Sequence, residues 1–281
     1  MEKIVLSPDF SHLEAFLRSL PERFARGEGE VLHQGRNEVR RLRYEGRDYV
    51  AKSFCRPHLL NRLVYGTLRG SKACRSYRHA LAFLRIGVGT PTPVGYMEVR
   101  IGLLLDRSYY VSLLSPCPYT YADLYADLPN GADGDGADAA ARTDGDSADA
   151  VACADAAPSS PCLSSRAEVL TAIGRTTALI HRAGYLHRDY SRGNILFGTD
   201  ADGRVSIQIV DLNRMLTHRR ISLRLGCKNF ERLPATPHMR HLMAQAYAQA
   251  RGFDTTECER LMARYRRQQA ERIPGVDVFP A

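Results

Sequence analysis

The sequence lacks any run of apolar residues long enough, about 18, to cross a membrane as a helix. After Met1 the residues are mixed and polar, with neither a signal-peptide pattern nor an amphipathic Arg-rich presequence. The seven cysteines include no Cys-x-x-Cys pair and no grouping at zinc-ligand spacing, which argues against a disulfide framework and a structural metal. We therefore expect a cytoplasmic protein with buried or incidental thiols.

Glutamate is missing from one stretch, residues 130–165, which holds seven aspartates and a single basic residue, Arg142. The rest of the chain has 38 basic and 24 acidic residues, a net charge of +14. This excess favours phosphate-bearing or anionic partners, and charge alone does not choose among nucleic acid, anionic lipid and acidic glycolipid.

The same stretch is poor in large apolar residues and rich in Ala, Asp, Gly and Ser. Such a composition predicts disorder. We interpret it as a tolerated surface insertion, because lengthening a loop costs little entropy; the alternative is a regulatory or tethering loop.

The residues before the insertion predict a small β-rich lobe with one long helix. Alternation over 39–52, interrupted at Glu45-Gly46, indicates a strand pair, residues 59–84 have a helical pattern, and two further strands are expected over 94–105 and 109–114. After the insertion, the sequence predicts a helix ending at Gly184, a strand pair over 195–197 and 205–210, and a mainly helical remainder over 239–272.

The residues His187-Arg188-Asp189-Tyr190-Ser191-Arg192-Gly193-Asn194 resemble the catalytic loop H-R-D-x-x-x-x-N of protein kinases. Asp211 follows the predicted strand pair, where the metal-binding Asp of the D-F-G motif would lie. Phosphoryl transfer needs a carboxylate to orient the acceptor hydroxyl and oxygen ligands for Mg²⁺. We predict that Asp189 is the catalytic base, that Asn194 and Asp211 are magnesium ligands, and that His187 and Ser191 support the loop.

Tyr49-Val50-Ala51-Lys52 resembles the strand motif whose lysine grips the α and β phosphates of ATP, so Lys52 is the predicted phosphate lysine. The nucleotide-covering loop is then expected at Gly35, Arg36 and Asn37, although G-x-G-x-x-G is absent and an ordinary hairpin turn is the alternative.

Further details resemble the bacterial lipopolysaccharide core kinases of the Kdo/WaaP type, particularly their Bacteroidetes-like members. Ser191 stands where protein serine kinases have Lys, which is similar to the RIO kinases, and Asp-Leu-Asn-Arg at 211–214 replaces D-F-G. Gly35-Arg36-Asn37, Ser71-Lys72-Ala73 and Gly-Thr-Pro-Thr-Pro at 89–93 add to the resemblance, which covers nearly all of the chain except the insertion. It implies transfer of the γ-phosphoryl group of ATP, with Mg²⁺, to a heptose or Kdo hydroxyl of the lipopolysaccharide inner core.

The region after Asp211 is too short for the activation segment of a protein kinase and contains no A-P-E motif. It is rich in basic residues, which would suit the carboxylates and phosphates of an inner-core saccharide or simply form a solvated surface. The acceptor-binding candidates in this cluster are Arg214, Arg219, Arg220 and Lys228.

One departure from the kinase pattern is the absence of any Asp or Glu between Ser53 and Met97. Protein kinases pair the strand lysine with a Glu on the following helix, so the alternatives for Lys52 are another acid, such as Glu38, phosphate alone, or no partner. This absence keeps open a catalytically silent pseudokinase that binds nucleotide or glycolipid. A RIO-like or atypical Ser/Thr protein kinase is a third hypothesis.

The leading hypothesis is an ATP-dependent lipopolysaccharide core sugar kinase with an α+β, two-lobed protein-kinase-like fold. The expected parts are an N-lobe over 1–115, a hinge and start of the C-lobe over 116–129, the insertion over 130–165, and a larger, mainly helical C-lobe over 166–281. The expected partner is the inner-core glycolipid, with peripheral contact at the cytoplasmic face of the inner membrane; neither DNA nor RNA is expected.

Overall fold

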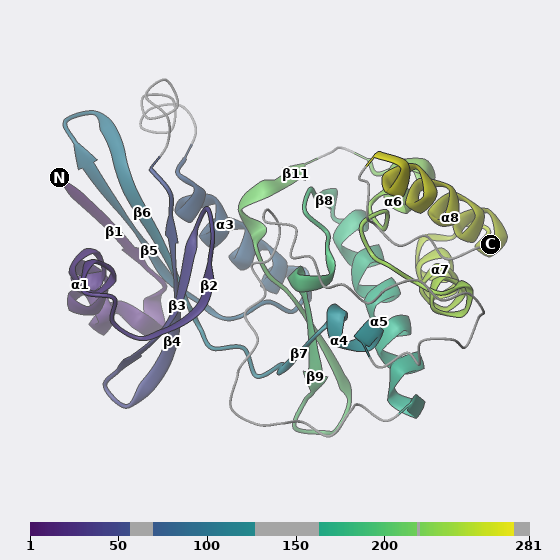
Figure 1. The fold of residues 1–281 in the computed structure, drawn as a ribbon, viewed down its shortest axis with the longest axis horizontal. Helices are drawn as coiled ribbons and strands as arrows, with labels where there is room; N and C mark the ends of the chain where they lie inside the picture. Colours follow the sequence, from purple (N-terminus) through teal and green to yellow (C-terminus); the bar gives the residue numbers. More distant parts are fainter. Residues whose placement is uncertain (57–69, 127–162, 218–219, 273–281) are drawn as a thin grey trace.

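The computed structural model describes residues 1–56, 70–126, 163–217 and 220–272. Its first half is built on a six-stranded antiparallel sheet with the order β1-β5-β6-β4-β3-β2. Figure 1 shows this sheet at one end of the molecule and the helices of the second half at the other end. The strands are β1 (Glu2–Leu6), β2 (Glu30–Gln34), β3 (Glu38–Tyr44), β4 (Arg47–Phe54), β5 (Pro93–Ile101) and β6 (Leu104–Leu113).

The hairpin of β3 and β4 turns at Glu45 and Gly46, which both have positive φ (48° and 77°). Successive side chains of a strand point to opposite faces, so β4 contributes to two different environments. Tyr49 and Ala51 belong to a hydrophobic cluster on one face, whereas Val50 and Lys52 line a cleft on the other. The predicted alternation therefore places Lys52 on the face turned toward the second half of the chain.

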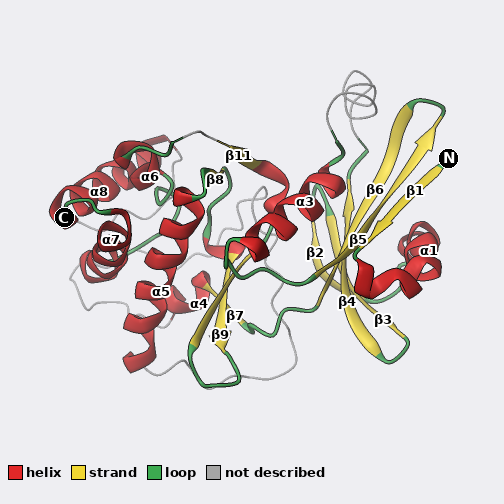
Figure 2. Ribbon diagram, turned by 180° about the vertical axis from the view of Figure 1, so that it is seen from behind, coloured by secondary structure: helices red, strands yellow, loops and turns green. Residues whose placement is uncertain are grey.

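The outer face of the sheet is covered by the helices η1 (Pro8–Leu13) and α1 (Glu14–Ala25) (Figure 2). Phe16, Leu17 and Leu20 of α1 are fully buried in the cluster that includes Tyr49 and Tyr109 of the sheet. Neither β1 nor α1 was predicted from the sequence. They complete the sheet and cover the face that faces away from the cleft.

The helix α3 (Lys72–Arg85) lies between the sheet and the second half (Figure 1). Ser71 caps it, since the Ser71 Oγ accepts a hydrogen bond from the Cys74 amide at 3.0 Å. The predicted helix over 59–84 falls partly on residues outside the described ranges, and its described part begins at Lys72.

The second half is mainly helical, with α5 packed against α7 and α7 against α8. Its short strands form two small sheets, β10-β9-β7 and β11-β8. These strands flank the segments that contain Asp189, Asn194 and Asp211. The elements are β7 (Tyr119–Thr120), α4 (Tyr121–Ala126), α5 (Leu163–Arg182), β8 (Tyr185–His187), η2 (Arg192–Asn194), β9 (Ile195–Thr199), β10 (Val205–Ile209), η3 (Leu212–Arg214), β11 (Met215–Thr217), α6 (Leu223–Lys228), α7 (Pro237–Arg251) and α8 (Thr255–Arg272).

Two boundaries differ from the sequence prediction. The turn between β5 and β6 falls at Gly102 and Leu103, several residues earlier than expected, because Gly102 supplies the positive φ of 59° that this turn uses. The helix α5 begins at Leu163, so the last three residues of the predicted disordered tract are helical; the tract before them lies outside the described residues.

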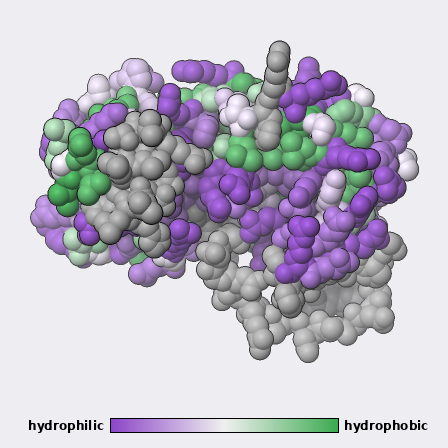
Figure 3. Space-filling view, turned by 90° about the horizontal axis from the view of Figure 1, so that it is seen from above, coloured by the Kyte–Doolittle hydropathy of each residue, from purple (hydrophilic) through white to green (hydrophobic). Residues whose placement is uncertain are grey.

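The surface seen from above is largely hydrophilic, with apolar side chains in separate groups (Figure 3). The large apolar side chains that are exposed include Ile101 and Leu103, at the tip of the β5–β6 hairpin. In the described part of the chain, no helix is long and apolar enough to span a bilayer.

The contact between α5 and α7 depends on Gly174. A Cβ at this position would lie 2.5 Å from the Met243 carbonyl oxygen and 2.9 Å from the Ala246 Cβ. At an exposed helix position Gly→Ala stabilises by about 0.5–1 kcal/mol, but overpacking costs about 1–3 kcal/mol. We expect Gly174→Ala to lower the free energy of unfolding, measured by urea denaturation.

The control for this prediction is Gln249→Ala, an exposed position on α7. Its free energy of unfolding should stay within about 0.5 kcal/mol of the unsubstituted protein. A Gly174→Ala protein as stable as this control would show that the two helices do not approach so closely.

Candidate active site

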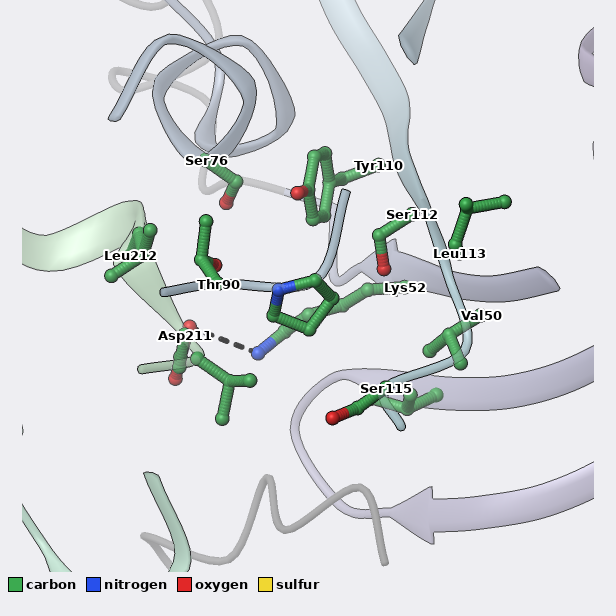
Figure 4. A pocket seen from close by; sticks show the side chains of 13 residues that line it. Val50, Lys52, Ser76, Thr90, Tyr110, Ser112, Leu113, Ser115, Asp211 and Leu212 are labelled. Carbon is green, nitrogen blue, oxygen red and sulfur yellow. Dashed lines mark ion pairs between the residues drawn. The ribbon is translucent and has the colours of Figure 1, made fainter. Parts of the chain in front are cut away.

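A cleft opens between the sheet and the helical half (Figure 4). Its roof comes from β3, β4 and β6, and its floor comes from the segment after β10. It is lined by Val39, Val50, Lys52, Ser76, Thr90, Pro91, Tyr110, Ser112, Leu113, Ser115, Val210, Asp211 and Leu212. A mostly apolar cleft with a few polar groups is the usual form of a small-molecule site.

An ion pair joins the two sides of the cleft, with the Lys52 Nζ 3.0 Å from the Asp211 Oδ1 (Figure 4). Both side chains are only about a tenth exposed, at 10% and 11%. The structure thus supplies an acid partner for Lys52 from the second half of the chain. Glu38, considered from the sequence, instead pairs with Arg40 at 2.6 Å.

Asp211 has an unusual backbone conformation, and hydrogen bonds from neighbouring residues stabilise the turn that contains it. Asp211 has a left-handed conformation (φ 57°, ψ 49°), which non-glycine residues rarely adopt. The Asn213 Nδ2 donates a hydrogen bond to the Asp211 Oδ1. The His79 Nδ1 on α3 donates to the Leu212 carbonyl oxygen at 2.7 Å, so α3 holds the same turn from the other side.

The loop between β8 and β9 carries Asp189 and Asn194. The Asn194 Nδ2 donates to the Asp189 carbonyl oxygen at 2.8 Å and to the Ser191 Oγ at 3.3 Å. The Val210 amide donates to the Asn194 carbonyl oxygen at 3.1 Å, which ties this loop to the segment containing Asp211. The predicted loop residues are therefore brought together by short-range hydrogen bonds.

The Asn194 Oδ1 is buried and makes no hydrogen bond with any described residue. A buried acceptor without a donor is costly, and a bound cation would remove that cost. Amide and carboxylate oxygens are the ligand types that Mg²⁺ prefers. Asn194 and Asp211 therefore fit a magnesium ion, although no cluster of three His, Cys, Asp or Glu side chains suited to a metal occurs among the described residues.

His187 lies beneath the loop and is fully buried. The Asp189 amide donates to its Nδ1 at 3.1 Å, and its Nε2 donates to the Val210 carbonyl oxygen at 3.0 Å. Burial lowers the pKa of His187, which agrees with a neutral ring that accepts at one nitrogen and donates at the other. These contacts join His187 to the loop and to the segment before Asp211; its supporting role remains a prediction.

A hydrogen-bond network behind His187, formed by Asn229, His181 and Tyr247, was not predicted from the sequence. The Asn229 Nδ2 donates to the His187 carbonyl oxygen at 2.7 Å. The Asn229 Oδ1 accepts from the His181 Nε2 at 3.0 Å, and the His181 Nδ1 accepts from the Tyr247 hydroxyl at 2.9 Å. These residues lie far apart in the chain and follow no local motif, so only the folded structure associates them.

The Asp189 carboxylate lies between two arginines. The Arg214 Nη1 is 3.0 Å from its Oδ2, and the Arg232 Nη1 is 3.1 Å from its Oδ1. Arg214 was an acceptor-binding candidate, whereas Arg232 was only one of the basic residues in the region. Of the other candidates, Arg220 and Lys228 are exposed and Arg219 lies outside the described residues.

Gly35, Arg36 and Asn37 form the turn between β2 and β3, in which the Gly35 amide donates to the Asn37 carbonyl oxygen at 3.1 Å. None of the three lines the cleft. Their predicted role over the nucleotide remains a prediction.

The two lobes, the strand lysine paired with Asp211 and the loop with Asp189 and Asn194 define a protein-kinase-like fold, as the sequence predicted. A family model described as the lipopolysaccharide kinase (Kdo/WaaP) family matches residues 149–265, the region that contains the loop and Asp211. This match confirms the predicted resemblance to the family. Because the family is one of lipopolysaccharide kinases, the match also agrees with the prediction of a kinase. The narrower resemblance to Bacteroidetes-like members remains a prediction.

Among solved structures, the chain is similar to WaaP in complex with acyl carrier protein, with a TM-score of 0.60 and 18% identity over 96% of this chain and 98% of that chain. It also aligns with the Rio2 kinase complex with ADP/Mg²⁺ and phosphoaspartate from Chaetomium thermophilum, with a TM-score of 0.44 and 15% identity over 92% of this chain and 78% of that one. No curated protein sequence matches the chain.

The buried His181 predicts a pH dependence of stability. Burial lowers the pKa of His181 to about 4, from an ordinary value of 6.5. Between these values the unfolded chain binds a proton that the folded protein does not, so stability falls as pH falls from 6.5 toward 4, by up to about 1.4 kcal/mol per pH unit. We expect His181→Gln to flatten this slope, measured by urea denaturation at a series of pH values.

His187 contributes in the same direction in both proteins, so the difference between the two pH profiles isolates His181. Parallel profiles over this pH range would contradict the prediction.

Proposed function

We propose that this protein transfers the γ-phosphoryl group of ATP to a hydroxyl of a heptose or Kdo residue in the lipopolysaccharide inner core. The observation that carries the proposal is the meeting of Lys52 and Asp211 in the cleft, next to a loop that holds Asp189 and Asn194. The sugar acceptor is supported by the description of the matched family. Such an acceptor would be met at the cytoplasmic face of the inner membrane.

In the proposed reaction, the acceptor hydroxyl oxygen forms a bond to the γ-phosphorus while the bond from that phosphorus to the bridging oxygen of ADP breaks. Asp189 orients the hydroxyl and receives its proton. Lys52 holds the phosphates, and Asn194 and Asp211 hold magnesium. When bound, magnesium neutralises negative charge on the phosphate oxygens.

The two arginines beside Asp189 are the side chains that we propose bind the acceptor. Arg214 is 53% exposed and Arg232 is 29% exposed, so both have surface available next to the proposed base. Arginine binds carboxylates and phosphates with paired hydrogen bonds. We propose that these two side chains exchange part of their contact with Asp189 for an acidic group of the acceptor.

The role of Asp189 is tested by Asp189→Asn, which keeps the size and removes the proton acceptor. We expect its kcat to fall by about 10²–10⁴, because a positioned base contributes about that much, and its affinity for ATP to be retained. The assay follows γ-labelled phosphate from Mg-ATP to a dephosphorylated inner-core glycolipid, with Asp202→Asn, an exposed hairpin residue, as the matched control.

Each outcome of this assay selects one function. Label on the glycolipid that depends on Asp189 supports the sugar kinase. Label on protein instead would support an atypical protein kinase, and ATP binding without any transfer would support a silent binding module.

The metal assignment is tested by comparing Asn194→Ala with Asn194→Asp. Both variants lose the Nδ2 donor that binds the loop, but only Asn194→Asp keeps an oxygen at the buried position. We expect Asn194→Ala to raise the Mg²⁺ concentration needed for half-maximal ATP binding by about tenfold or more, and Asn194→Asp to raise it much less. An equal effect in both variants would mean that Asn194 only supports the loop.

A further inference from the structure

Lys72 lies one helical turn before Ser76, the residue of α3 that lines the cleft. It is the first residue of that helix, directly after the capping residue Ser71. Ser76 is one turn further along; its Oγ donates to the Lys72 carbonyl oxygen at 3.1 Å, and its side chain lines the cleft (Figure 4). Residues four apart share a helix face, so Lys72 continues the cleft-facing side of α3 toward β4.

Lys72 and Lys52 both lie beside the aromatic ring of Phe54. The Lys52 Nζ is 5.5 Å from the centroid of this ring, and the Lys72 Nζ is 5.9 Å from the same centroid. The predicted phosphate lysine and Lys72 therefore share one aromatic neighbour.

The charge of Lys72 is not compensated by an acid in the described part of the chain. Lys52 is paired with Asp211, but Lys72 forms no ion pair with any described residue. Burial, Arg36, Lys52 and Arg75 all lower its pKa, opposed only by the Cys55 thiol. Like charges held together in a partly buried place are unfavourable, and an anion between them would relieve the repulsion.

The helix itself adds to the positive character of this place. The chain has no Asp or Glu between Ser53 and Met97, and the first turn of α3 is without an acid. A lysine at the start of a helix is also disfavoured by the helix dipole. The helix that carries the acid partner of the strand lysine in protein kinases thus has no acid here and begins with a lysine.

We infer that Lys72 is a second phosphate-binding lysine, which holds the triphosphate of the nucleotide together with Lys52. The inference rests on the proposed nucleotide-dependent function. Lysine suits this task because its ammonium group has three donors that can follow phosphate oxygens in more than one arrangement. The two lysines would have different roles. Lys52 binds both Asp211 and the phosphates, whereas Lys72 binds the phosphates only.

The alternative is that Lys72 only covers the ring of Phe54. A cation beside an aromatic ring contributes to the folded protein whether or not a nucleotide is bound. The two roles therefore differ in how the effect of a substitution depends on the number of phosphates in the ligand.

The test measures binding of Mg-ATP, Mg-ADP, adenosine and inorganic tripolyphosphate by calorimetry, with melting temperatures taken without ligand. We expect Lys72→Met to weaken binding of Mg-ATP and tripolyphosphate by about tenfold or more, since a charge-assisted hydrogen bond is lost. Binding of Mg-ADP should weaken less, and binding of adenosine should not change. Lys72→Arg should restore most of the affinity for tripolyphosphate.

The matched control is Lys3→Met, which removes one positive charge from an exposed position on β1. It should bind all four ligands as the unsubstituted protein does. Any loss of tripolyphosphate affinity in this control measures the effect of net charge alone.

Two results would overturn the inference while leaving the proposed function intact. One is unchanged binding of Mg-ATP and tripolyphosphate by Lys72→Met. The other is an equal loss of affinity for adenosine and Mg-ATP together with a lower melting temperature, which would give Lys72 a structural role. Failure of the unsubstituted protein to bind any nucleotide would instead overturn the proposed function, and the inference with it.

Discussion

The ion pair between Lys52 and Asp211 is the interaction on which the arrangement of the site depends. It joins a strand of the sheet to the segment that follows β10, and both side chains are about nine-tenths buried. Charges in such a place attract strongly, but they are also costly to bury, so neither partner is readily left alone. The pair therefore favours a closed approach of the two lobes, and the hydrogen bond from His79 to Leu212 adds α3 to the same contact.

The loop that carries Asp189 is held differently on its two sides. Behind it, His187, Asn229 and His181 form a buried, neutral network in which each ring nitrogen has a defined partner. In front of it, Arg214 and Arg232 contact the Asp189 carboxylate and remain partly exposed. Neutral groups suit the interior because they avoid the cost of burying charge, and exposed arginines suit a surface that meets an anionic ligand.

The strands around Lys52 and the order of the site residues could be predicted from the sequence, because alternation and short motifs are local. The helix α1 and strand β1 were missed, since their burial depends on a sheet assembled from distant strands. Arg232 was seen only as part of a basic region, because 43 residues separate it from Asp189 in the chain. The partner of Lys52 was left open for the same reason: Glu38, one acid considered, pairs with Arg40, and the distant Asp211 pairs with Lys52.

The sequence by itself determined the two-lobed class of fold, the chemical types available to the site and the absence of acid between Ser53 and Met97. These properties follow from residue identity and spacing along the chain, which folding does not alter. Only the tertiary structure decided which charges meet, which nitrogen of each histidine donates, and that the Asn194 Oδ1 lies buried without a donor among the described residues. Such properties depend on distances of a few ångströms between residues that are far apart in sequence, and those distances are set only when the close-packed tertiary structure forms.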